Sequence, residues 1–395
     1  MKPTTAVAEV LDKARDITHP LMREAVATLV PSIREVVNYH LGWAAADGTP
    51  VEVPGGKGIR PALAMLSAQS AWAAPEIGAP GGAAVELVHN FSLIHDDLMD
   101  GDRERRHRPT VWTVWGPSVA LLAGDALSTL ATEWLLSVPS PHAPAAAAAL
   151  GSATAEMIAG QADDLAFERR RSVSVEECMA MSTAKTGALL GSAASIGAIL
   201  AGAAPATVAA LRDFGRHLGV AFQAVDDLLG IWGDPATTGK PSGNDIRQRK
   251  KSMPIVAALG AGDDEARELE SILFGPSDDA TAEPDEAMVP VAATEVHKNN
   301  NNGKGKGKGN GLRDRGATGA AEVPDWSPQA RRPLSADEVT RATWLVEACG
   351  GREWTAARAK AHLDAALGSL ERARLSAVPR RALADLAVYV VERES

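Results

Sequence analysis

The sequence is organised around residues 91–110, which read Phe91-Ser-Leu-Ile-His-Asp96-Asp97-Leu-Met-Asp100-Gly-Asp-Arg-Glu-Arg105-Arg106-His-Arg-Pro-Thr. In a helix of 3.6 residues per turn, Asp96 and Asp100 lie one turn apart on the same face, and Asp97 lies about 100° away from Asp96. Two carboxylates in this relation repel each other, so the spacing favours a cation between them. Mg²⁺ suits that place, because proteins hold it with one or two carboxylates and leave the other positions to water and substrate phosphates. The arginine pair fits the same chemistry, since a guanidinium group binds phosphate oxygens two at a time.

The composition limits the class of protein. The 395 residues suffice for one large domain or two smaller ones, and an apolar content of 45% is ordinary for a globular protein. Aromatic residues make up only 4% while alanine is abundant, which favours helices packed through small and aliphatic side chains over a β-sandwich. We therefore predict an all-α fold. The formal net charge of −10 argues against a general nucleic-acid-binding surface.

The cysteines and the apolar segments bear on the compartment. Cys178 and Cys349 lie far apart without metal-ligand spacing, and the N-terminal residues lack the apolar run of a signal peptide, so we expect a cytoplasmic protein. Residues 186–211 contain no charged side chain and are long enough to cross a membrane. They consist mainly of alanine, glycine and serine and include Pro205, so we interpret them as closely packed buried helices and expect no membrane span.

A cationic stretch precedes the acidic one. The segment Gly55-Gly-Lys57-Gly-Ile-Arg60-Pro follows a turn-rich loop and precedes an apolar helix pattern. Glycines let the backbone approach a ligand closely, and Lys57 and Arg60 stand where the dipole of the next helix also favours an anion. His89 lies two turns before Asp96 and within about 20° of its face, so it points into the same groove. Each feature alone also fits solvated charges or a structural histidine.

A second acidic cluster strengthens the metal interpretation. It reads Phe222-Gln223-Ala-Val-Asp226-Asp227-Leu-Leu-Gly230 and is followed by Lys240 and by Asp245-Ile-Arg-Gln-Arg-Lys250-Lys251. Alone, the first cluster would also fit a solvated acidic helix end before a basic loop. Two helices that each deliver an Asp-Asp pair from an apolar stretch can instead hold divalent cations across the cavity of a helical bundle. The lysines that follow supply partners for an anion.

Two weaker signals lie between the clusters. Gly160-Gln161-Ala-Asp163-Asp164 places polar groups in an alanine-rich helix, where they must be exposed or line a polar cavity. Lys185-Thr186-Gly187 adds a cation and a hydroxyl group before the small-residue helix. Neither signal is specific by itself.

The chain is predicted to contain one domain, formed by residues 1–274 and 335–395, with a disordered low-complexity insertion at residues 275–334. The insertion is rich in Asp, Glu, Pro and Ala and then runs through Asn299–Asn302 into alternating Gly and Lys. Such a segment cannot bury enough apolar surface to offset its ordering entropy. A tether, an anion-attracting arm and a neutral segment all fit this composition, and we favour the last.

Taken in order, the motifs resemble those of the trans-isoprenyl diphosphate synthases (polyprenyl synthetases), of the farnesyl and geranylgeranyl diphosphate synthase type. The resemblance covers about residues 5–274 and 335–395 and rests on the Gly-Gly-Lys-Gly-Ile-Arg-Pro loop, both acidic clusters, Gly-Gln-Ala-Asp-Asp-Leu and Lys185-Thr186. It implies an isoprenoid synthase-type helical bundle around a central apolar cavity. It also implies a homodimeric prenyltransferase that condenses isopentenyl diphosphate with allylic diphosphates.

The resemblance also implies residue roles. Three Mg²⁺ ions per active site would be held by Asp96, Asp97, Asp100, Asp226 and Asp227. The allylic diphosphate would be bound by Lys185, Lys240 and Arg105, and the isopentenyl diphosphate by Lys57, Arg60, His89 and Arg106. Gln161, Thr186 and Gln223 would line the site, and Asp164 would reach the metal-diphosphate cluster. These groups would take up the charge of the departing diphosphate, so that the isopentenyl double bond attacks the allylic cation and a proton is then lost.

Three positions bear on how closely the chain follows the family. Gly230 stands where the family carries a third carboxylate, and we do not expect Asp234 to replace it. His107 stands where the family usually has glycine, which predicts a change confined to the loop. Phe91, five positions before Asp96, is bulky and Ser92 is small, and by resemblance to the family a single bulky residue at this depth implies a medium-length product, C20, with C15 next. Phe91 also fits ordinary core packing.

Two other classes of protein remain open. A class I terpene cyclase would share the fold and the first acidic motif, but Lys57, Arg60 and Arg106 are redundant unless a second diphosphate binds. A non-catalytic regulatory subunit of a prenyl synthase is disfavoured by intact aspartates in both clusters, although Gly230 keeps it open. A tether to a larger assembly through the insertion has no recognisable docking motif.

Overall fold

The computed structural model describes residues 4–51, 53, 56–234, 242–275 and 332–392. Chain contacts divide the molecule into two units, Met1–Gly275 with Ser335–Ser395, and Pro276–Leu334. Nearly all the described residues belong to the first unit. Lys240 and most of the low-complexity segment lie outside the described residues, and the predicted division at 274 and 335 stays a prediction.

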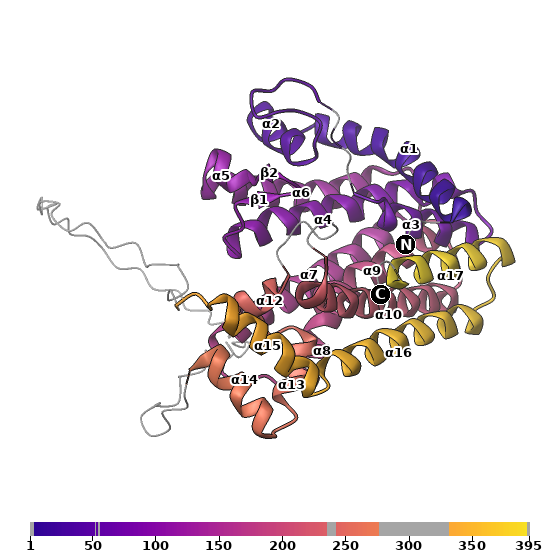
Figure 1. The fold of residues 1–395 in the computed structure, drawn as a ribbon. Helices are drawn as coiled ribbons and strands as arrows, with labels where there is room; N and C mark the ends of the chain where they lie inside the picture. The colour runs from indigo at the N-terminus through magenta and orange to yellow at the C-terminus, as the bar shows by residue number, and fades with distance from the viewer. Residues whose placement is uncertain (1–3, 52, 54–55, 235–241, 276–331, 393–395) are drawn as a thin grey trace, which may run out of the picture. The chain divides into compact units, whose positions relative to one another are not determined.

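The first half of the chain is helical (Figure 1). Its helices are α1 (Thr5–Ala27), α2 (Pro31–His40), α3 (Ile59–Ser70), the 3₁₀ turn η1 (Pro75–Ile77), α4 (Ala79–Met99), α5 (Val111–Trp115), α6 (Pro117–Ser137) and α7 (Ala143–Arg169). A short antiparallel hairpin of β1 (Glu104–Arg105) and β2 (Arg108–Pro109) follows α4 and is the one sheet among the described residues. The all-α prediction is therefore confirmed.

The second half continues in the same way. Its elements are α8 (Val175–Ser182), the π-helical turn η2 (Thr183–Gly187), α9 (Ala188–Leu200), α10 (Pro205–Trp232), α12 (Asn244–Arg247), α13 (Met253–Leu259), α14 (Asp264–Phe274), α15 (Ala336–Ala348), α16 (Gly351–Arg372) and α17 (Ala377–Glu392). Local side-chain chemistry explains where several helices begin. Ser174 and Ser335 form capping boxes at the starts of α8 and α15, and Pro205 occupies the first turn of α10, where its missing N–H costs nothing.

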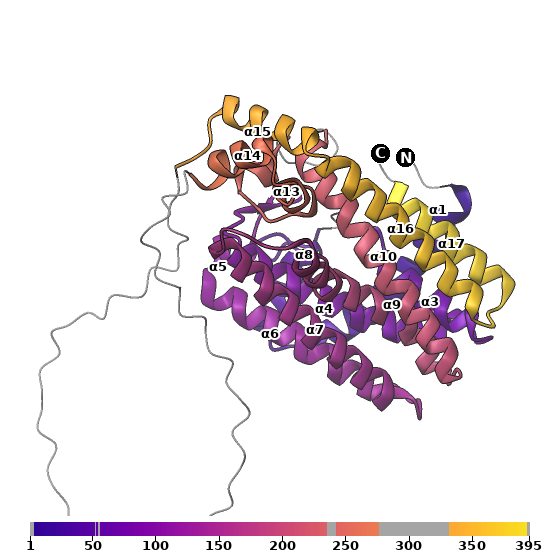
Figure 2. The same cartoon turned by 90° about the horizontal axis from the view of Figure 1, so that it is seen from below.

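The long helix α10 packs against α9 and α16, and α9 packs in turn on α3 and α7 (Figure 2). Almost every residue of α9 is buried, as the charge-free stretch predicted. Small residues make this possible: a Cβ on Gly219 would lie 2.6 Å from the Cα of Gly187, so only glycine allows α10 to approach η2 this closely. The apolar core thus supports the polar ends of α4, α7, η2 and α10.

The helix α6 has an unusual balance of burial and composition. It packs against α4 and α7. By length and composition it is the one helix in the described ranges that is apolar enough to cross a membrane, yet only 39% of its apolar window is buried. The stretch at 186–211 does not have this property in the structure, because Ala201 to Ala204 separate α9 from α10.

Candidate active site

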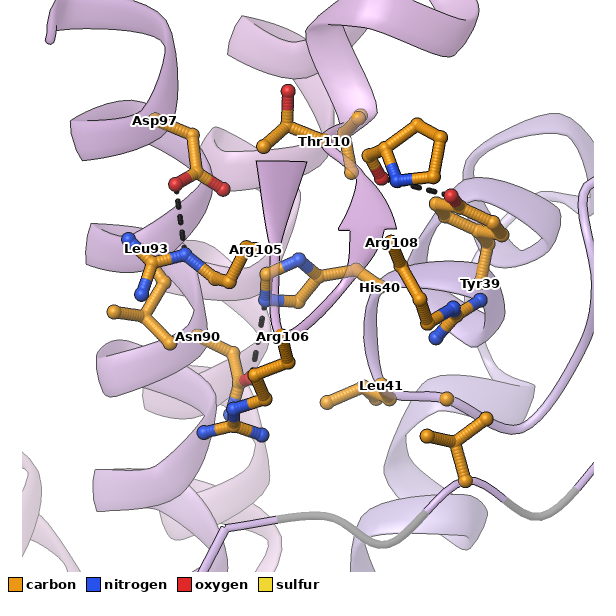
Figure 3. Close-up of a pocket in the computed structure, with 14 residues that line it drawn as sticks. Tyr39, His40, Leu41, Asn90, Leu93, Asp97, Arg105, Arg106, Arg108 and Thr110 are labelled. Atoms are coloured by element: carbon orange, nitrogen blue, oxygen red, sulfur yellow. Dashed lines mark hydrogen bonds and ion pairs between the residues drawn. The ribbon is translucent and has the colours of Figure 1, made fainter. Parts of the chain in front are cut away.

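The first acidic cluster ends α4, and its middle aspartate is paired with an arginine. Asp97 is 2% exposed and accepts a hydrogen bond of 2.7 Å from Nε of Arg105, on the hairpin that follows α4 (Figure 3). Burial raises the pKa of Asp97 to about 6, against the lowering effect of the Arg105 guanidinium. Asp97 therefore holds the guanidinium group of Arg105 in place, in addition to any contact with a metal.

The outer pair of the cluster is more accessible. Asp96 is half-buried and Asp100 is exposed, one turn apart on α4. Burial raises the pKa of Asp96 to about 6 and also raises the pKa of Asp100, while the ammonium group of Lys185 opposes both shifts. Two carboxylates on one helix face, with a lysine nearby, form an anionic site that a divalent cation would stabilise.

Lys185 reaches this site from the π-helical turn η2. Its Nζ donates a hydrogen bond to the carboxylate of Asp164 on α7. The close approach depends on Gly160, because a Cβ there would overlap the backbone of Lys185. Single π-turns of this kind are frequently found at functional sites. The two weak sequence signals at 160–164 and 185–187 are thus brought together.

The second acidic cluster is built differently. Asp227 is 4% exposed, and its two oxygens accept hydrogen bonds from Nε2 of Gln223 at 2.8 Å and from the backbone N–H of Met253 at 2.9 Å. Thr186 in turn donates to Oε1 of Gln223 at 2.8 Å. Burial raises the pKa of Asp227 to about 7. Asp226, half-buried and about 100° away around α10, is left as the better placed of the two for a metal.

A lysine without an assigned role joins the two clusters. Burial lowers the pKa of Lys250, but neighbouring carboxylates outweigh this effect and raise it above its ordinary value, in decreasing order Asp245, Asp227, Asp164 and Asp100. These groups come from α12, α10, α7 and the end of α4, so the ammonium group interacts electrostatically with carboxylates of both clusters. The lysines after Asp245 in the sequence could have indicated this position. The sequence analysis instead assigned the diphosphate-binding role to Lys240, which lies outside the described residues.

A cationic cavity lies behind the first cluster. It is lined by residues that include His40, Asn90, Asp97, Arg105, Arg106 and Arg108 (Figure 3). A second cavity shares His40, Asn90 and Arg106 with the first and adds Gly56, Glu86 and His89. Burial lowers the pKa of His89 well below its ordinary value, and Arg60 and Arg106 lower it further. The predicted residues Arg60, His89 and Arg106 are thus brought together. The fourth predicted residue, Lys57, has its Nζ 5.9 Å from the ring centroid of Tyr389 on α17.

His40 belongs to this cavity, although no spacing signal in the sequence indicated it. Its Nε2 lies 3.1 Å from Oδ1 of Asn90. Burial, followed by Arg105 and Arg106, lowers the pKa of His40 to about 3, so the ring is neutral at physiological pH. Because the amide oxygen can only accept, Nε2 carries the proton and donates a hydrogen bond to Oδ1 of Asn90. The positive charge of the cavity therefore comes from its arginines.

The two residues predicted to set chain length differ in their surroundings. The Phe91 ring is buried and meets the ring of His95 edge to face, with centroids 4.9 Å apart. His95 lies over Gly124 of α6, where any side chain would overlap its imidazole. Ser92 donates a hydrogen bond of 2.8 Å to the carbonyl of His89. Phe91 is therefore supported from behind by a packed imidazole.

The side chains that are present fit magnesium bound together with a diphosphate. In the described part of the chain, no three His, Cys, Asp or Glu side chains converge into a metal site by themselves. That agrees with a cation that takes one or two carboxylates and completes its shell with phosphate oxygens and water. Among the described residues, the buried Oε1 and Nε2 of Gln161 have no hydrogen-bond partner, which points to a polar ligand that satisfies them.

An all-α bundle that combines two acidic helix ends with a surrounding set of cations belongs to the class of proteins that bind diphosphate esters with divalent metal. Comparison with known proteins specifies the class. A family model described as polyprenyl synthetase matches residues 49–288. A (2E,6E)-farnesyl diphosphate synthase of Mycobacterium tuberculosis is 41% identical over 392 residues, which cover 99% of this chain and 95% of the relative.

Two further comparisons agree. A geranylgeranyl diphosphate synthase of Mycobacterium tuberculosis is 42% identical over 268 residues, covering 68% of this chain and 77% of the relative. The crystal structure of a polyprenyl synthetase from Streptomyces coelicolor A3(2) is 44% identical with a TM-score of 0.80, covering 98% of this chain and 99% of that one. The chain belongs to the polyprenyl synthetase family. The resemblance and the isoprenoid synthase-type fold are confirmed, and the comparisons give no support to a terpene cyclase or a regulatory subunit.

Proposed function

We propose that this chain is a trans-prenyltransferase that condenses isopentenyl diphosphate with allylic diphosphates and releases a medium-chain all-trans prenyl diphosphate. The observation that carries the proposal is the divergence of two adjacent arginines. Arg105 pairs with Asp97 beside the acidic clusters, whereas Arg106 lines the second cavity with His89. Arg106 also lines the first cavity together with Arg105. One short hairpin thus serves two adjoining anion sites, as a reaction between two diphosphates requires.

The residues divide into two sets. We assign Asp96, Asp100 and Asp226 to metal binding, with Asp97 and Asp227 holding the surrounding groups in place. Lys185, Arg105 and Lys250 face the allylic diphosphate, and Lys240 is retained as a predicted fourth cation. Lys57, Arg60, His89 and Arg106 hold the isopentenyl diphosphate. Thr186 and Gln223 form the hydrogen-bonded wall between η2 and α10.

The family depends on Mg²⁺, which when bound supplies positive charge against the departing diphosphate. We propose three ions per active site. Lys185, Arg105 and Lys250 stabilise the same charge from fixed positions, because their carboxylate partners hold them before the substrate arrives. The neutral His40 and the arginines of the cavity orient the isopentenyl diphosphate, so that its double bond attacks the allylic cation. The released diphosphate is the base that we propose for the proton then lost.

The product is proposed to be C20, with C15 as the next candidate. Phe91 is bulky, and His95 and Gly124 prevent it from moving toward α6. Farnesyl and geranylgeranyl diphosphate synthases both occur among the relatives. Cytoplasmic localisation remains a prediction.

A homodimer is also proposed, through the outer face of α6 and α7. Leu121, Leu122 and Leu136 on α6 are 46%, 58% and 55% exposed, and Ile158 on α7 is 49% exposed. A second copy of the chain would bury these side chains and account for the low burial of α6. Leu122→Glu should convert the dimer to a monomer in sedimentation velocity, while Ala145→Glu, at an exposed alanine near the start of α7, should not. A monomeric parent chain would contradict the proposal.

The test of the function is product analysis. The purified protein is incubated with Mg²⁺, isopentenyl diphosphate and, separately, C5, C10 and C15 allylic diphosphates, and the products are identified by chromatography and mass spectrometry. We expect a dominant C20 or C15 diphosphate that disappears when the metal is chelated. Cyclised hydrocarbon from an allylic diphosphate alone, or no turnover with any primer, would contradict the proposal.

A further inference from the structure

An exposed tryptophan follows α3 in a backbone conformation that suits glycine. Trp72 has a positive φ of 66°, and its N–H donates to the carbonyl of Gln69 at 3.0 Å. The N–H of Ala73 donates to the carbonyl of Ala68 at 3.1 Å, and the two bonds form the Schellman motif, in which glycine usually holds the position of Trp72. A side chain costs stability in this left-handed region. Because the Trp72 side chain is 79% exposed, burial does not offset that cost.

Two more apolar side chains are exposed nearby. Ile77, in the turn η1 before α4, is 45% exposed, and Val378, in the first turn of α17, is 80% exposed. The connection between α16 and α17 is joined to the end of α3, because the N–H of Ser376 donates to the carbonyl of Ser70 at 3.3 Å. Trp72 and Val378 each lie two residues from this hydrogen bond, so they belong to neighbouring connections.

The same connections carry a local excess of positive charge. Four exposed arginines lie at the end of α16 and near the start of α17: Arg372, Arg374, Arg380 and Arg381. Residues 71–78 and 371–381 contain two acidic residues, Glu76 and Glu371, against these four. Arg380 lies in the first turn of α17, where the positive end of the helix dipole disfavours a cation. This region is therefore locally positive on a chain whose formal net charge is −10.

These connections lie away from the acidic clusters. The helix α4 begins directly after η1 and ends in the first cluster, and at 1.5 Å per residue about 25 Å of helix separates Ala79 from Asp96. The turn between α16 and α17 and the hairpin after α4 lie at opposite ends of the bundle (Figure 1). A partner bound at these connections would therefore not cover the diphosphate sites.

We propose that Trp72, Ile77, Val378 and the four arginines form a surface that binds an anionic phospholipid bilayer. Tryptophan suits the boundary between headgroups and acyl chains, because its ring is apolar and its N–H is polar. Exposed arginines are attracted to anionic headgroups at short range. A bilayer also needs no matching groove, which suits side chains spread over two connections.

The net negative charge of the rest of the molecule would orient this surface toward such a bilayer. The contact is peripheral and requires no membrane-spanning helix. The inference goes beyond the proposed function, since it concerns where the enzyme works. It is compatible with that function, because a C15 or C20 prenyl chain partitions into a bilayer.

The test measures cosedimentation of the full-length protein with lipid vesicles in the absence of substrates. Vesicles of phosphatidylcholine with about 30% phosphatidylglycerol, in about 50 mM NaCl, should bind the parent chain at least about tenfold more tightly than vesicles of phosphatidylcholine alone. Raising the salt to about 0.5 M should release the protein, because the headgroup attraction is screened.

Trp72→Gly is the sharpest variant, because binding and stability should change in opposite directions. Glycine relieves the left-handed backbone, so the midpoint of thermal unfolding should rise. Loss of the indole should weaken binding to the anionic vesicles about tenfold. Trp344→Ala removes a tryptophan that is 51% exposed on α15 and is the matched control, which should leave vesicle binding unchanged.

The arginines are tested in the same assay. Arg380→Gln/Arg381→Gln should weaken binding to the anionic vesicles about tenfold and reduce its dependence on salt. Arg170→Gln/Arg171→Gln removes two adjacent exposed charges between α7 and α8 and should leave binding unchanged. Equal losses in the two double variants would mean that any positive charge suffices, which overturns the inference.

Two further results would also overturn it. One is a parent chain that does not bind anionic vesicles, or a Trp72→Gly chain that binds them as the parent does. The other is a changed oligomeric state of Trp72→Gly in sedimentation velocity without vesicles, which would assign the surface to a second copy of the chain. Because no substrate is present, none of these results bears on the proposed condensation, which product analysis tests separately.

Discussion

The two acidic clusters share the letters Asp-Asp but use the second aspartate differently. On α4, Asp97 binds the guanidinium of Arg105, the cation that we propose acts on the allylic diphosphate. On α10, Asp227 binds the Gln223 amide and the backbone N–H of Met253, which are parts of the scaffold. A buried carboxylate that ties down a mobile cation prepares a binding site, whereas one that ties down a helix start maintains the fold. The same dipeptide thus serves positioning in one cluster and stability in the other.

The clusters also differ in what lies behind them. The first has a cationic cavity on its far side, with His40 and three arginines among its lining residues. The second has α13 and the segment that carries Asp245 and Lys250. We infer that the first cluster adjoins both substrates, while the second serves the allylic diphosphate and its metals.

The largest expected effect comes from the residues in which the two clusters agree. Asp96→Ala and Asp226→Ala should each lower kcat by about 100- to 1000-fold, because each removes a group that stabilises developing charge in the transition state. The rate of condensation is measured at saturating Mg²⁺ and both substrates. Unfolding by urea should be close to that of the parent chain for both variants. An unchanged rate in either variant would remove that residue from the site.

The next prediction separates the second aspartates. Asp227→Ala leaves two buried donors without an acceptor and should lower the free energy of unfolding by about 2 kcal/mol. Asp97→Ala releases the partly exposed Arg105 and should mainly raise KM for the allylic substrate, by about tenfold. Urea unfolding and steady-state kinetics on both variants give the comparison.

Asp227→Asn provides the control for this pair. Its amide can still accept from Met253, and the Gln223 amide can turn over to match it, since the Thr186 hydroxyl accepts as well as donates. It should therefore keep most of the parent stability. Equal stability losses in Asp97→Ala and Asp227→Ala would mean that the two clusters do not differ in the way described.

Much of the site followed from local spacing along helices. The positions of Asp96, Asp97 and Asp100 at one helix end depend only on residues a turn apart, and the structure places the first two on α4 and Asp100 at its C-cap. Small-residue composition likewise predicted the buried helix α9, whereas residues 201–210, which were also expected to be buried, are half-buried or exposed. The five ordered motifs indicated the polyprenyl synthetase family, and the comparisons confirm this assignment.

The division of roles within each pair could not be predicted in the same way. It depends on which element packs about 100° around the helix from the outer aspartate: the hairpin with Arg105 on α4, and the start of α13 on α10. His40 ends a helix without any charge pattern of its own, and it becomes part of the site only because Asn90 packs against it. Such contacts join segments that are distant in sequence, so the helical periodicity of the sequence does not predict them.

The cavity behind the first cluster gives a pH-dependent prediction. In the unfolded chain His40 titrates near 6.5, whereas in the folded protein its pKa is about 3. Between these values the unfolded chain binds a proton that the folded protein refuses, so stability should fall as the pH drops through this window. His40→Gln keeps a donor toward Asn90 and cannot be protonated. It should reduce the loss of unfolding free energy between pH 7 and pH 4.5 by about 2 kcal/mol.

Urea unfolding at both pH values measures this difference. His142→Gln, at an exposed histidine before α7, is the matched control and should leave the pH dependence unchanged. If His40→Gln loses as much stability on acidification as the parent chain, the ring is not held neutral by its surroundings. The neutral His40 could then no longer be used to distinguish the cavity behind the first cluster from the segment behind the second.

The smallest effect concerns the turn that delivers Arg105 and Arg106 after the first cluster. Arg106 and His107 have positive φ values of 52° and 60°, so His107 occupies a backbone region that favours the glycine usual in the family. The expectation of a change confined to the loop agrees with the exposed position of its side chain. His107→Gly removes the strain of a left-handed residue but adds entropy to the unfolded chain, so the net gain should be about 0.5 kcal/mol.

His107→Ala keeps the Cβ and should give no such gain, which makes it the control for this change. Both variants should keep the parent KM for isopentenyl diphosphate, because the Arg106 side chain is unchanged. A rise in that KM in His107→Gly alone would mean that the stiffness of the turn, and not only its shape, holds Arg106 in its cavity. The first cluster would then depend on backbone strain for substrate binding, whereas the second relies on buried hydrogen bonds.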